Sequence, residues 1–433
     1  MKAHLMYRGR DFDLQQALPA NQQALSQDLE LKTLFRAMAG GDKFLVEVAK
    51  QALLSGLRND WETILYRQAV LRDCLRNYSV VKEIYDIAVE SIESKNRHWG
   101  FGFFNYPSSI LYGAVELLQM FMGMLRKLKL LADEHSDKFE SEGFAAFFAM
   151  LKAELADEYF ASIQGHLKQL KFRGGVLVSA ELGRGNEGIH YVLRESLRKK
   201  LGWIEQIFAP RPPGYTFYIA DRDEAGHQAV SELRGRGINL VANAAAQSAD
   251  HITNFFLMLQ TELAFYVGCV NLHGHLTRKG EPVCVPVPAP RGARKHSCTE
   301  LRDVCLALSV EQQLVGNDLG ADGKNLVIVT GANQGGKSTF LRGIGLAQLM
   351  MQCGMFVVAE SFSADICRGL FTHYKREEDT TMNSGKLDEE LSRMSNIVVA
   401  LTPDSVLLFN ESFAATNERE GNPRLRARSS ALY

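Results

Sequence analysis

The sequence has little net charge and no paired cysteine motif. Its 49 Lys and Arg residues balance 50 Asp and Glu residues, which leaves a formal net charge of −1. No overall positive field therefore indicates nucleic-acid binding, and any DNA contact must come from a local basic patch. The seven cysteines include no C-x-x-C pair. This spacing predicts reduced, structural cysteines in a cytoplasmic protein and argues against disulfides or a zinc site.

Long hydrophobic runs are also missing. The N-terminus has no apolar core of the signal-peptide type. The most apolar run, at residues 110–125, contains Glu116 and ends at Arg126 and Lys127. It is too short and too interrupted to span a bilayer, so it predicts a buried helix and no membrane contact. At 433 residues, the chain is long enough for two or three domains with their own cores.

The segment GANQGGKST matches G-x-x-x-x-G-K-[ST], a phosphate-binding loop. A strand-like run at 326–329 precedes it and a helical pattern follows it. Glycine lacks a Cβ, so the N–H groups of Gly335 and Gly336 can approach phosphate oxygens closely. Lys337 places a positive charge on the β- and γ-phosphates, and Ser338 can ligate Mg²⁺. The motif predicts a site for ATP and Mg²⁺ at Gly331, Ala332, Asn333, Gln334, Gly335, Gly336, Lys337, Ser338 and Thr339.

A second element of the site is predicted near the end of the chain. Residues 406–409, VLLF, have the composition of a buried strand, and Asn410 and Glu411 follow them. In a Walker B strand the first acid holds Mg²⁺ through water and the last one polarises the attacking water. Here Asn410 offers an amide at the metal position, and Glu411 is the candidate general base. The alternative is a polar strand end with no metal role.

Apolar residues recur at helical spacing over most of the first 280 residues. Leu31, Leu34, Phe35 and Met38 are one example, at i, i+3, i+4 and i+7. Further helices are expected at 107–131, 145–170 and 224–272, the last with a turn at 235–237. Short β-like runs are expected at 176–180, 189–193 and 215–220.

Basic residues gather around these β-like runs. Such a local cluster can contact DNA phosphates, and a solvated charged face is the alternative. Its members are Lys168, Lys171, Arg173, Arg184, Arg194, Arg198, Lys199, Lys200 and Arg211.

Four prolines forbid a helix after the last long helical pattern and predict a linker. They are Pro282, Pro286, Pro288 and Pro290. From about residue 301 onward strands alternate with helices, which is typical of a parallel P-loop sheet.

With both nucleotide motifs in place, the chain resembles the MutS family of DNA mismatch-repair ATPases. TGANQGGKST at 330–339 is similar to that family's TGPNMGGKST, and 412–417 stand where the family has GRGTST. Ser384-Gly385 resembles the start of the family's serine-bearing signature. The resemblance implies that Ser384 acts in trans on the γ-phosphate of a partner subunit, and that the chain forms a homodimer through its ATPase domain.

The resemblance also implies a multidomain fold. An all-α core and lever region with a small β clamp-like insertion would precede an α/β P-loop (ABC-type) ATPase domain. The expected parts are a helical core and lever at 1–165, a β clamp-like element at 166–222, a returning helical arm at 223–278, a Pro-rich linker at 279–300, an incomplete ATPase domain at 301–421 and a disordered tail at 422–433.

Several departures from the family pattern bear on activity. Asn410 replaces a carboxylate, and acidic residues at 388–390 follow the signature segment. The family's mismatch-recognition domain and its switch histidine have no counterpart, so we expect a truncated chain that binds ATP and hydrolyses it slowly. Two functions stay open: an ATPase that couples ATP state to a DNA clamp, and a nucleotide-binding scaffold with little or no hydrolysis. A chromosome-maintenance ATPase of the wider ABC type would need a sustained heptad run, and the sequence has none.

Overall fold

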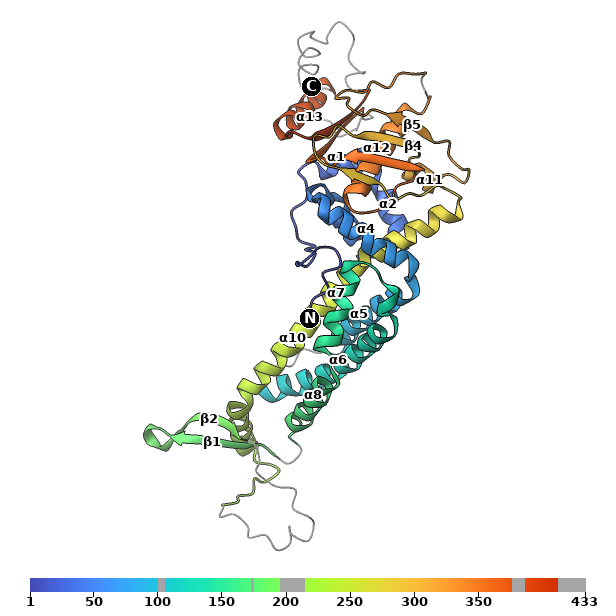
Figure 1. Cartoon of the computed structure of the whole chain (residues 1–433). Coiled ribbons are helices and arrows are strands. Elements are labelled where there is room, and N and C mark those ends of the chain that lie inside the picture. Colours follow the sequence, from blue (N-terminus) through green and yellow to red (C-terminus); the bar gives the residue numbers. More distant parts are fainter. Residues whose placement is uncertain (100–105, 173–174, 195–214, 333, 376–385, 412–433) are drawn as a thin grey trace. The chain divides into compact units, whose positions relative to one another are not determined.

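The computed structural model describes residues 1–99, 106–172, 175–194, 215–332, 334–375 and 386–411 (Figure 1). The chain divides into two compact units. The first comprises Met1, Asp86–Asp133 and Met150–Leu257. The second comprises the described residues of Lys2–Tyr85, Glu134–Ala149 and Met258–Tyr433. Most of the described residues are helical and the strands form small sheets, as the sequence predicts.

The first unit is mainly a helical bundle. Its residues come from α5 (Tyr78–Trp99), α6 (Pro107–His135), α7 (Glu142–Glu154), α8 (Asp157–Leu170), β1 (Leu177–Leu182), η3 (Arg184–Asn186), β2 (Gly188–Arg194) and α10 (Glu224–Arg278). Phe121 of α6 and Phe256 of α10 have ring centroids 5.5 Å apart. The guanidinium of Arg126 lies 5.1 Å from the ring centroid of Phe160 on α8. The helix expected at 145–170 is therefore two helices, α7 and α8, because the chain breaks between them.

Strands β1 and β2 form an antiparallel hairpin, so the first two β-like runs are confirmed. The third, at 215–220, forms no strand. The turn expected at 235–237 is also wrong, because α10 is continuous there. Gly237 instead permits a close contact, since a Cβ on it would lie 2.4 Å from Cγ2 of Val178 on β1. Arg236 adds a second contact, 3.8 Å from Glu187.

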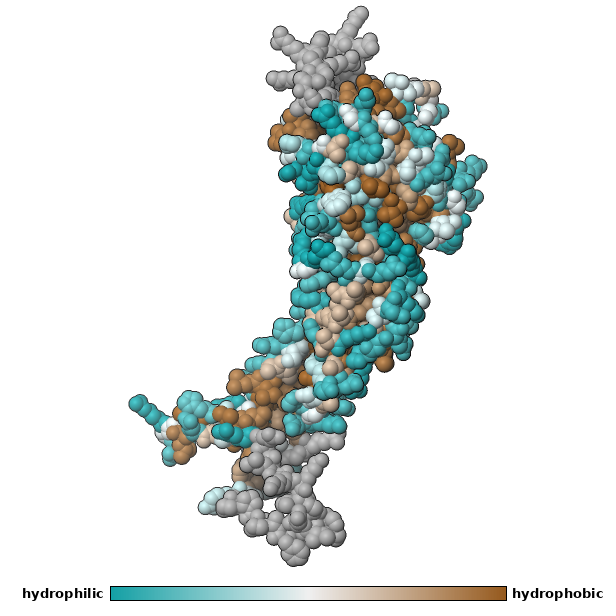
Figure 2. All heavy atoms as spheres, in the orientation of Figure 1, coloured by the Kyte–Doolittle hydropathy of each residue, from teal (hydrophilic) through white to brown (hydrophobic). Residues whose placement is uncertain are grey.

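The hairpin and the adjoining part of α10 present apolar side chains at the surface (Figure 2). These exposed residues are Leu177, Leu182, Ile189, Val192, Val230, Leu233 and Leu240. Successive side chains of β1 and β2 point to opposite faces of the hairpin. Apolar side chains on these strands are nevertheless exposed, so neither strand buries all of its apolar residues.

The second unit begins with short helices, two of which have an aspartate at the N-cap. Its helices, besides the shared α5, α6, α7 and α10, are α1 (Gln22–Asp28), α2 (Leu31–Ala39), α3 (Lys43–Ser55), η1 (Gly56–Arg58), α4 (Trp61–Arg76), η2 (Ser136–Lys138), α11 (Val304–Ser309), α12 (Lys337–Gln352) and α13 (Lys386–Ala400). Asp42 and Asp60 cap α3 and α4 by accepting from the N–H groups of Phe44 and Thr63. The predicted apolar stripe of α2 is buried, which confirms that helix.

Two sheets occur in the described part of the second unit. The strands are β3 (Val287–Ala289), β4 (His296–Leu301), β5 (Asn317–Gly320), β6 (Ser361–Asp365), β7 (Gly369–Tyr374) and β8 (Ser405–Asn410). One sheet has the order β3-β6-β4-β5, and the other pairs β7 with β8. Only the β3–β6 and β7–β8 pairings are parallel. The wholly parallel sheet expected from residue 301 onward is therefore not what these residues form.

The proline-rich segment is not a linker, because it contains β3 and the start of β4. Proline lacks an N–H group and is tolerated in strands at a sheet edge, which is where β3 lies. Side chains of α4 bind two of its carbonyl oxygens. Gln68 Nε2 donates to Pro286 at 2.9 Å, and Trp61 Nε1 donates to Pro288 at 3.2 Å. The edge of β3 is thereby partly closed to other strands.

Two helices, α6 and α10, are long and apolar enough to cross a membrane by length and composition. The most apolar stretch of α6 is 50% buried within the protein, and that of α10 is 72% buried. Core helices of folded proteins show such burial, and the buried helix expected at 110–125 is confirmed as part of α6. The absence of membrane contact stays a prediction.

Candidate functional site

The loop that the sequence predicts to bind phosphate, at 331–339, leads into the N-terminus of α12. Asn333 lies outside the described residues, and the other eight residues of the motif lie within them. Gln334 and Gly336 have positive φ values of 64° and 81°, so the chain turns sharply twice before the helix. Gly336 is the N-cap and offers no side-chain hydrogen bond to α12. The first N–H groups of α12 are therefore available to an anion.

Lys337 folds back over this loop. Its Nζ donates to the carbonyl oxygens of Gly331 at 2.9 Å and Ala332 at 2.7 Å. Lys337 is half-buried, and the two carbonyl oxygens are neutral acceptors. A phosphate group is a stronger partner for an ammonium than a carbonyl is, because the hydrogen bond is then charge-assisted on both sides. The loop thus keeps the lysine close to where phosphates would lie.

The two predicted motifs meet through one hydrogen bond. Ser338 Oγ donates to Asn410 Oδ1 at 2.8 Å. Asn410 ends β8, which pairs in parallel with β7 so that Tyr374 stands opposite Asn410. The backbone N–H of Lys375 donates to the carbonyl of Asn410 at 3.0 Å and fixes the strand end further. The hydrogen bond between Ser338 and Asn410 joins residues that are 72 positions apart in the sequence.

Glu411 follows Asn410 in a left-handed backbone conformation, with φ 49°. Its carboxylate lies 3.9 Å from Nζ of Lys375, and both side chains are more than 40% exposed. Sequence reasoning missed Lys375, because nothing in its local pattern distinguishes it from a surface lysine. At such exposure this ion pair contributes little to stability. Glu411 therefore stands at the strand end with a cation beside it.

The oxygen atoms of Ser338 and Asn410 fit a magnesium ion only if a bound nucleotide supplies further ligands. Mg²⁺ prefers oxygen ligands, and Ser338 and Asn410 supply a hydroxyl and an amide oxygen, both uncharged. In the described ranges of the chain, no group of three His, Cys, Asp or Glu side chains could hold a metal ion. Nucleotide phosphates would have to supply the negative charge of the shell. The donor set is thus that of a metal–nucleotide complex rather than a free metal site.

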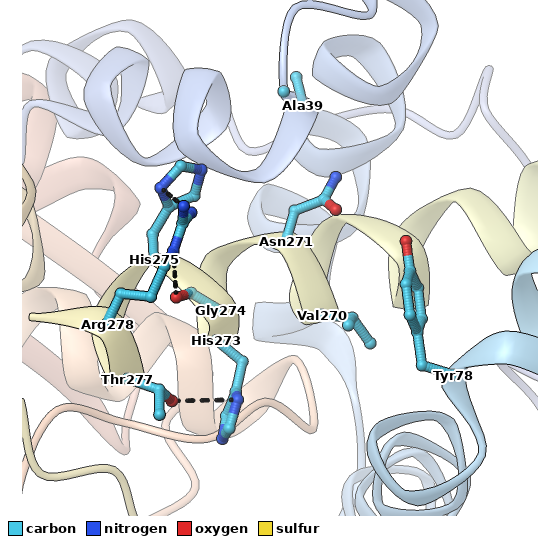
Figure 3. Close-up of a pocket in the computed structure, with 10 residues that line it drawn as sticks. Ala39, Tyr78, Val270, Asn271, His273, Gly274, His275, Thr277 and Arg278 are labelled. Atoms are coloured by element: carbon cyan, nitrogen blue, oxygen red, sulfur yellow. Dashed lines mark hydrogen bonds between the residues drawn. The ribbon is translucent and has the colours of Figure 1, made fainter. Parts of the chain in front are cut away.

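A separate pocket of about 620 Å³ lies where the ends of α2 and α10 meet the start of α5 (Figure 3). His273 Nδ1 and Thr277 Oγ1 are 3.3 Å apart, and Arg278 Nη2 lies 3.0 Å from His275 Nδ1. Burial lowers the pKa of His273, which therefore stays neutral at pH 7. None of the lining residues belongs to the phosphate-binding loop or to β8. This pocket is distinct from the loop of α12.

Parts of the other predicted sites fall outside the described residues. These parts are Ser384 of the signature segment and Arg173, Arg198, Lys199, Lys200 and Arg211 of the basic cluster. Within the described ranges, Lys171 Nζ donates to Glu116 and Gln119, both at 3.1 Å. Arg194 Nε donates to Ser179 Oγ across the hairpin at 2.9 Å. These two cations are therefore partly engaged within the chain.

Comparison with known proteins finds two family models along the chain. The model of the MutS2 N-terminal domain matches residues 59–279, and that of MutS domain V matches residues 327–424. The first match alone covers half of the chain. The chain therefore belongs to the MutS family.

Curated relatives match over a shorter segment. Human "MutS protein homolog 4" is 34% identical over 114 residues, which are 26% of this chain and 12% of that protein. "DNA mismatch repair protein MutS" of Porphyromonas gingivalis is 37% identical over 120 residues, which are 26% of this chain and 14% of that protein. The matched segments thus span about an eighth of the length of these relatives.

Proposed function

We propose that this chain binds ATP with Mg²⁺ at the loop before α12 and uses the nucleotide state to control DNA binding by its helical and β elements. The observation that carries the proposal is the hydrogen bond between Ser338 and Asn410 at 2.8 Å, which brings the phosphate-binding loop to the end of β8. Membership in a family with relatives named for DNA mismatch repair supports the same proposal.

Binding would use the loop as it stands. The N–H groups at the start of α12 and the ammonium of Lys337 would hold the phosphates. Ser338 would ligate Mg²⁺, and Asn410 would bind the same ion through water. When bound, Mg²⁺ would neutralise phosphate charge in the transition state. Asn333 and Thr339 would complete the phosphate contacts of the motif.

Hydrolysis would need Glu411 to orient and deprotonate the attacking water. General bases of this kind contribute about 10²–10⁴-fold to a rate. Lys375 lies 3.9 Å from the Glu411 carboxylate. Asn410 adds no negative charge to the metal shell, and this supports slow turnover of ATP to ADP and phosphate.

The proposal also includes contacts with DNA and with a second copy of the chain. The basic residues near β1 and β2 would contact DNA phosphates, and Ser384 would reach the γ-phosphate of a second copy in a homodimer formed through the ATPase domain. We place the protein in the cytoplasm, where its seven free cysteines would stay reduced.

An ATPase assay with and without DNA tests this proposal. We expect slow ATP hydrolysis that changes when branched, mismatched or plain duplex DNA is added. Glu411→Gln should retain ATP binding and lose most of the single-turnover rate. Equal rates for the parent and this variant would remove Glu411 as the base.

The second candidate is a nucleotide-binding scaffold with little or no hydrolysis. Asn410 favours it, because the site lacks the carboxylate that would hold the metal strongly. Under this alternative, ATP would change DNA or partner binding while no phosphate is released, even when DNA is present. Phosphate release measured over several hours distinguishes the two functions.

A further inference from the structure

Arg342 lies in the second turn of α12, five residues after Lys337. Its Nε donates to Asp303 Oδ2, and its Nη1 donates to Glu30 Oε1. The side chain of Arg342 is 15% exposed and that of Asp303 is 0% exposed. Glu30 stands at the N-cap of α2 and Asp303 at the N-cap of α11. One guanidinium thus joins α12 to the starts of two other helices.

Asp303 is itself held rigidly. Its Oδ1 accepts from the backbone N–H groups of Cys305 at 2.9 Å and Leu306 at 3.1 Å. These bonds cap α11 and leave Oδ2 for Arg342. A buried carboxylate and a buried guanidinium each depend on the other, because removal of either leaves an uncompensated charge. Both oxygens of the Asp303 carboxylate are therefore engaged, one by the start of α11 and the other by Arg342.

Glycines place the same part of α12 close to its neighbours. A Cβ on Gly343 would lie 3.6 Å from the Cα of Asp303. A Cβ on Gly345 would lie 2.8 Å from side-chain atoms of both Leu29 and Leu408. Leu408 belongs to β8 and precedes Asn410 by two residues. A rotation or shift of α12 that broke the Arg342 contacts would therefore also disturb its packing on the strand that carries Asn410.

We propose that Arg342 is a positioning residue for the nucleotide site. By anchoring α12 to Asp303 and Glu30, it holds Lys337 and Ser338 in place relative to Asn410. Arg342 acts through the helix, since its donors are directed at the two carboxylates. This inference rests on the proposed function, because it concerns the affinity of the same loop for nucleotide.

The test measures nucleotide affinity and stability together in the full chain. Arg342→Met and Asp303→Asn should each raise the Kd for ATP by about tenfold or more at temperatures where the variants are folded, because small displacements of binding groups are costly. Arg342→Lys should recover part of the affinity, since an ammonium keeps the charge but cannot reach both carboxylates equally. Glu30→Gln, at a half-exposed position, provides a milder variant if the others fold poorly.

Asp73→Asn is the matched control. Asp73 is also buried and accepts from backbone N–H groups ahead of a helix, at 3.1 Å from Glu140 and 2.7 Å from Ser141, and these hydrogen bonds lead to the start of α7 rather than to α12. It should lower the melting temperature as Asp303→Asn does and leave the Kd unchanged. An unchanged Kd in Arg342→Met and Asp303→Asn would overturn the inference, and so would an equal loss of affinity in Asp73→Asn. A parent chain that binds ATP no better than Lys337→Ala would instead overturn the proposed function, and the inference with it.

Discussion

The carboxylate of Glu262 holds the start of the chain in the second unit. It accepts hydrogen bonds from the backbone N–H groups of Leu5 at 2.5 Å, Met6 at 3.3 Å and Phe12 at 3.0 Å. The residue is fully buried. Burial raises the pKa of Glu262 to about 7, although the three N–H donors oppose that rise. The charge state of this single side chain therefore depends on pH near neutrality.

We expect Glu262 to make stability depend on pH between its ordinary pKa and 7. In this window the folded state binds more protons than the unfolded state, so the free energy of unfolding falls as pH rises. A shift from 4.5 to about 7 corresponds to a loss of up to about 3 kcal/mol. Glu262→Gln removes this titration. Thermal unfolding at pH 5 and pH 8 should therefore show a larger fall in the parent than in the variant, and equal falls would contradict the assignment.

Asn410 ends β8 at the position where a Walker B strand has a carboxylate. Its Oδ1 accepts from Ser338 as a carboxylate would, but it adds no charge. Asn410→Asp should make ATP binding more dependent on Mg²⁺, because an anionic outer-sphere partner strengthens the metal shell. Asn410→Ala serves as the control that removes the acceptor. ATP titrations across a range of Mg²⁺ concentrations check this, and identical curves for the Asn and Asp proteins would place Asn410 outside the metal shell.

At the scale of elements, the glycines of α10 show two different uses of the same residue. A Cβ on Gly237 would lie 2.4 Å from Cγ2 of Val178, whereas a Cβ on Gly235 would meet Pro107 at an ordinary 3.6 Å. Alanine is favoured over glycine in a helix by about 1 kcal/mol. At Gly235 that preference is unopposed, and at Gly237 it competes with a clash against the hairpin.

We therefore expect opposite effects from two alanine substitutions. Gly235→Ala should stabilise the first unit slightly, while Gly237→Ala should displace β1 from α10. Hydrogen exchange of the amides at 177–194 measures the displacement, with faster exchange expected only in Gly237→Ala. Unchanged hydrogen exchange in Gly237→Ala would contradict the displacement of β1 and would mean that Val178 changes rotamer instead.

The elements that could be predicted from the sequence are those with a complete local signal. The apolar spacing of Leu31, Leu34, Phe35 and Met38 was sufficient for α2. The turn at 235–237 was a wrong prediction, because glycine within a helix can serve close packing as well as a turn. The prediction of a linker at 279–300 was wrong, because prolines are compatible with an edge strand whose carbonyl oxygens are bound by α4. Those contacts involve residues more than 200 positions apart.

For the candidate site, the motif spacing was enough to predict that Ser338 and Asn410 belong together. The strand expected at 326–329 is not formed in the structure, and Leu326, Val327 and Ile328 are exposed. The ion pair of Glu411 with Lys375 and the bridge from Arg342 to Glu30 had no local signal, because each depends on how distant elements pack.

At the scale of the whole molecule, the proposal requires DNA binding that depends on phosphate contacts. Replacing Arg194, Arg198, Lys199 and Lys200 by neutral residues should weaken duplex binding. Each lost phosphate contact should reduce the slope of log K against log salt by about 0.9. Neutral replacements of Lys32, Arg36, Lys43 and Lys50, which are exposed on α2 and α3, are the matched control. A slope that is unchanged in the first variant would show that the basic cluster is only a solvated face.

Nucleotide binding at the loop before α12 is the central claim, and titration calorimetry of ATP with Mg²⁺ against the parent and Lys337→Ala tests it most directly. Lys337 is half-buried, and among the described residues its ammonium bonds only to two carbonyl oxygens of its own loop, so the variant should fold as the parent does. We predict saturable binding by the parent and a loss of about 10²-fold or more in the variant, because a charge-assisted contact to phosphate is removed. Equal affinity in the two proteins would contradict the account.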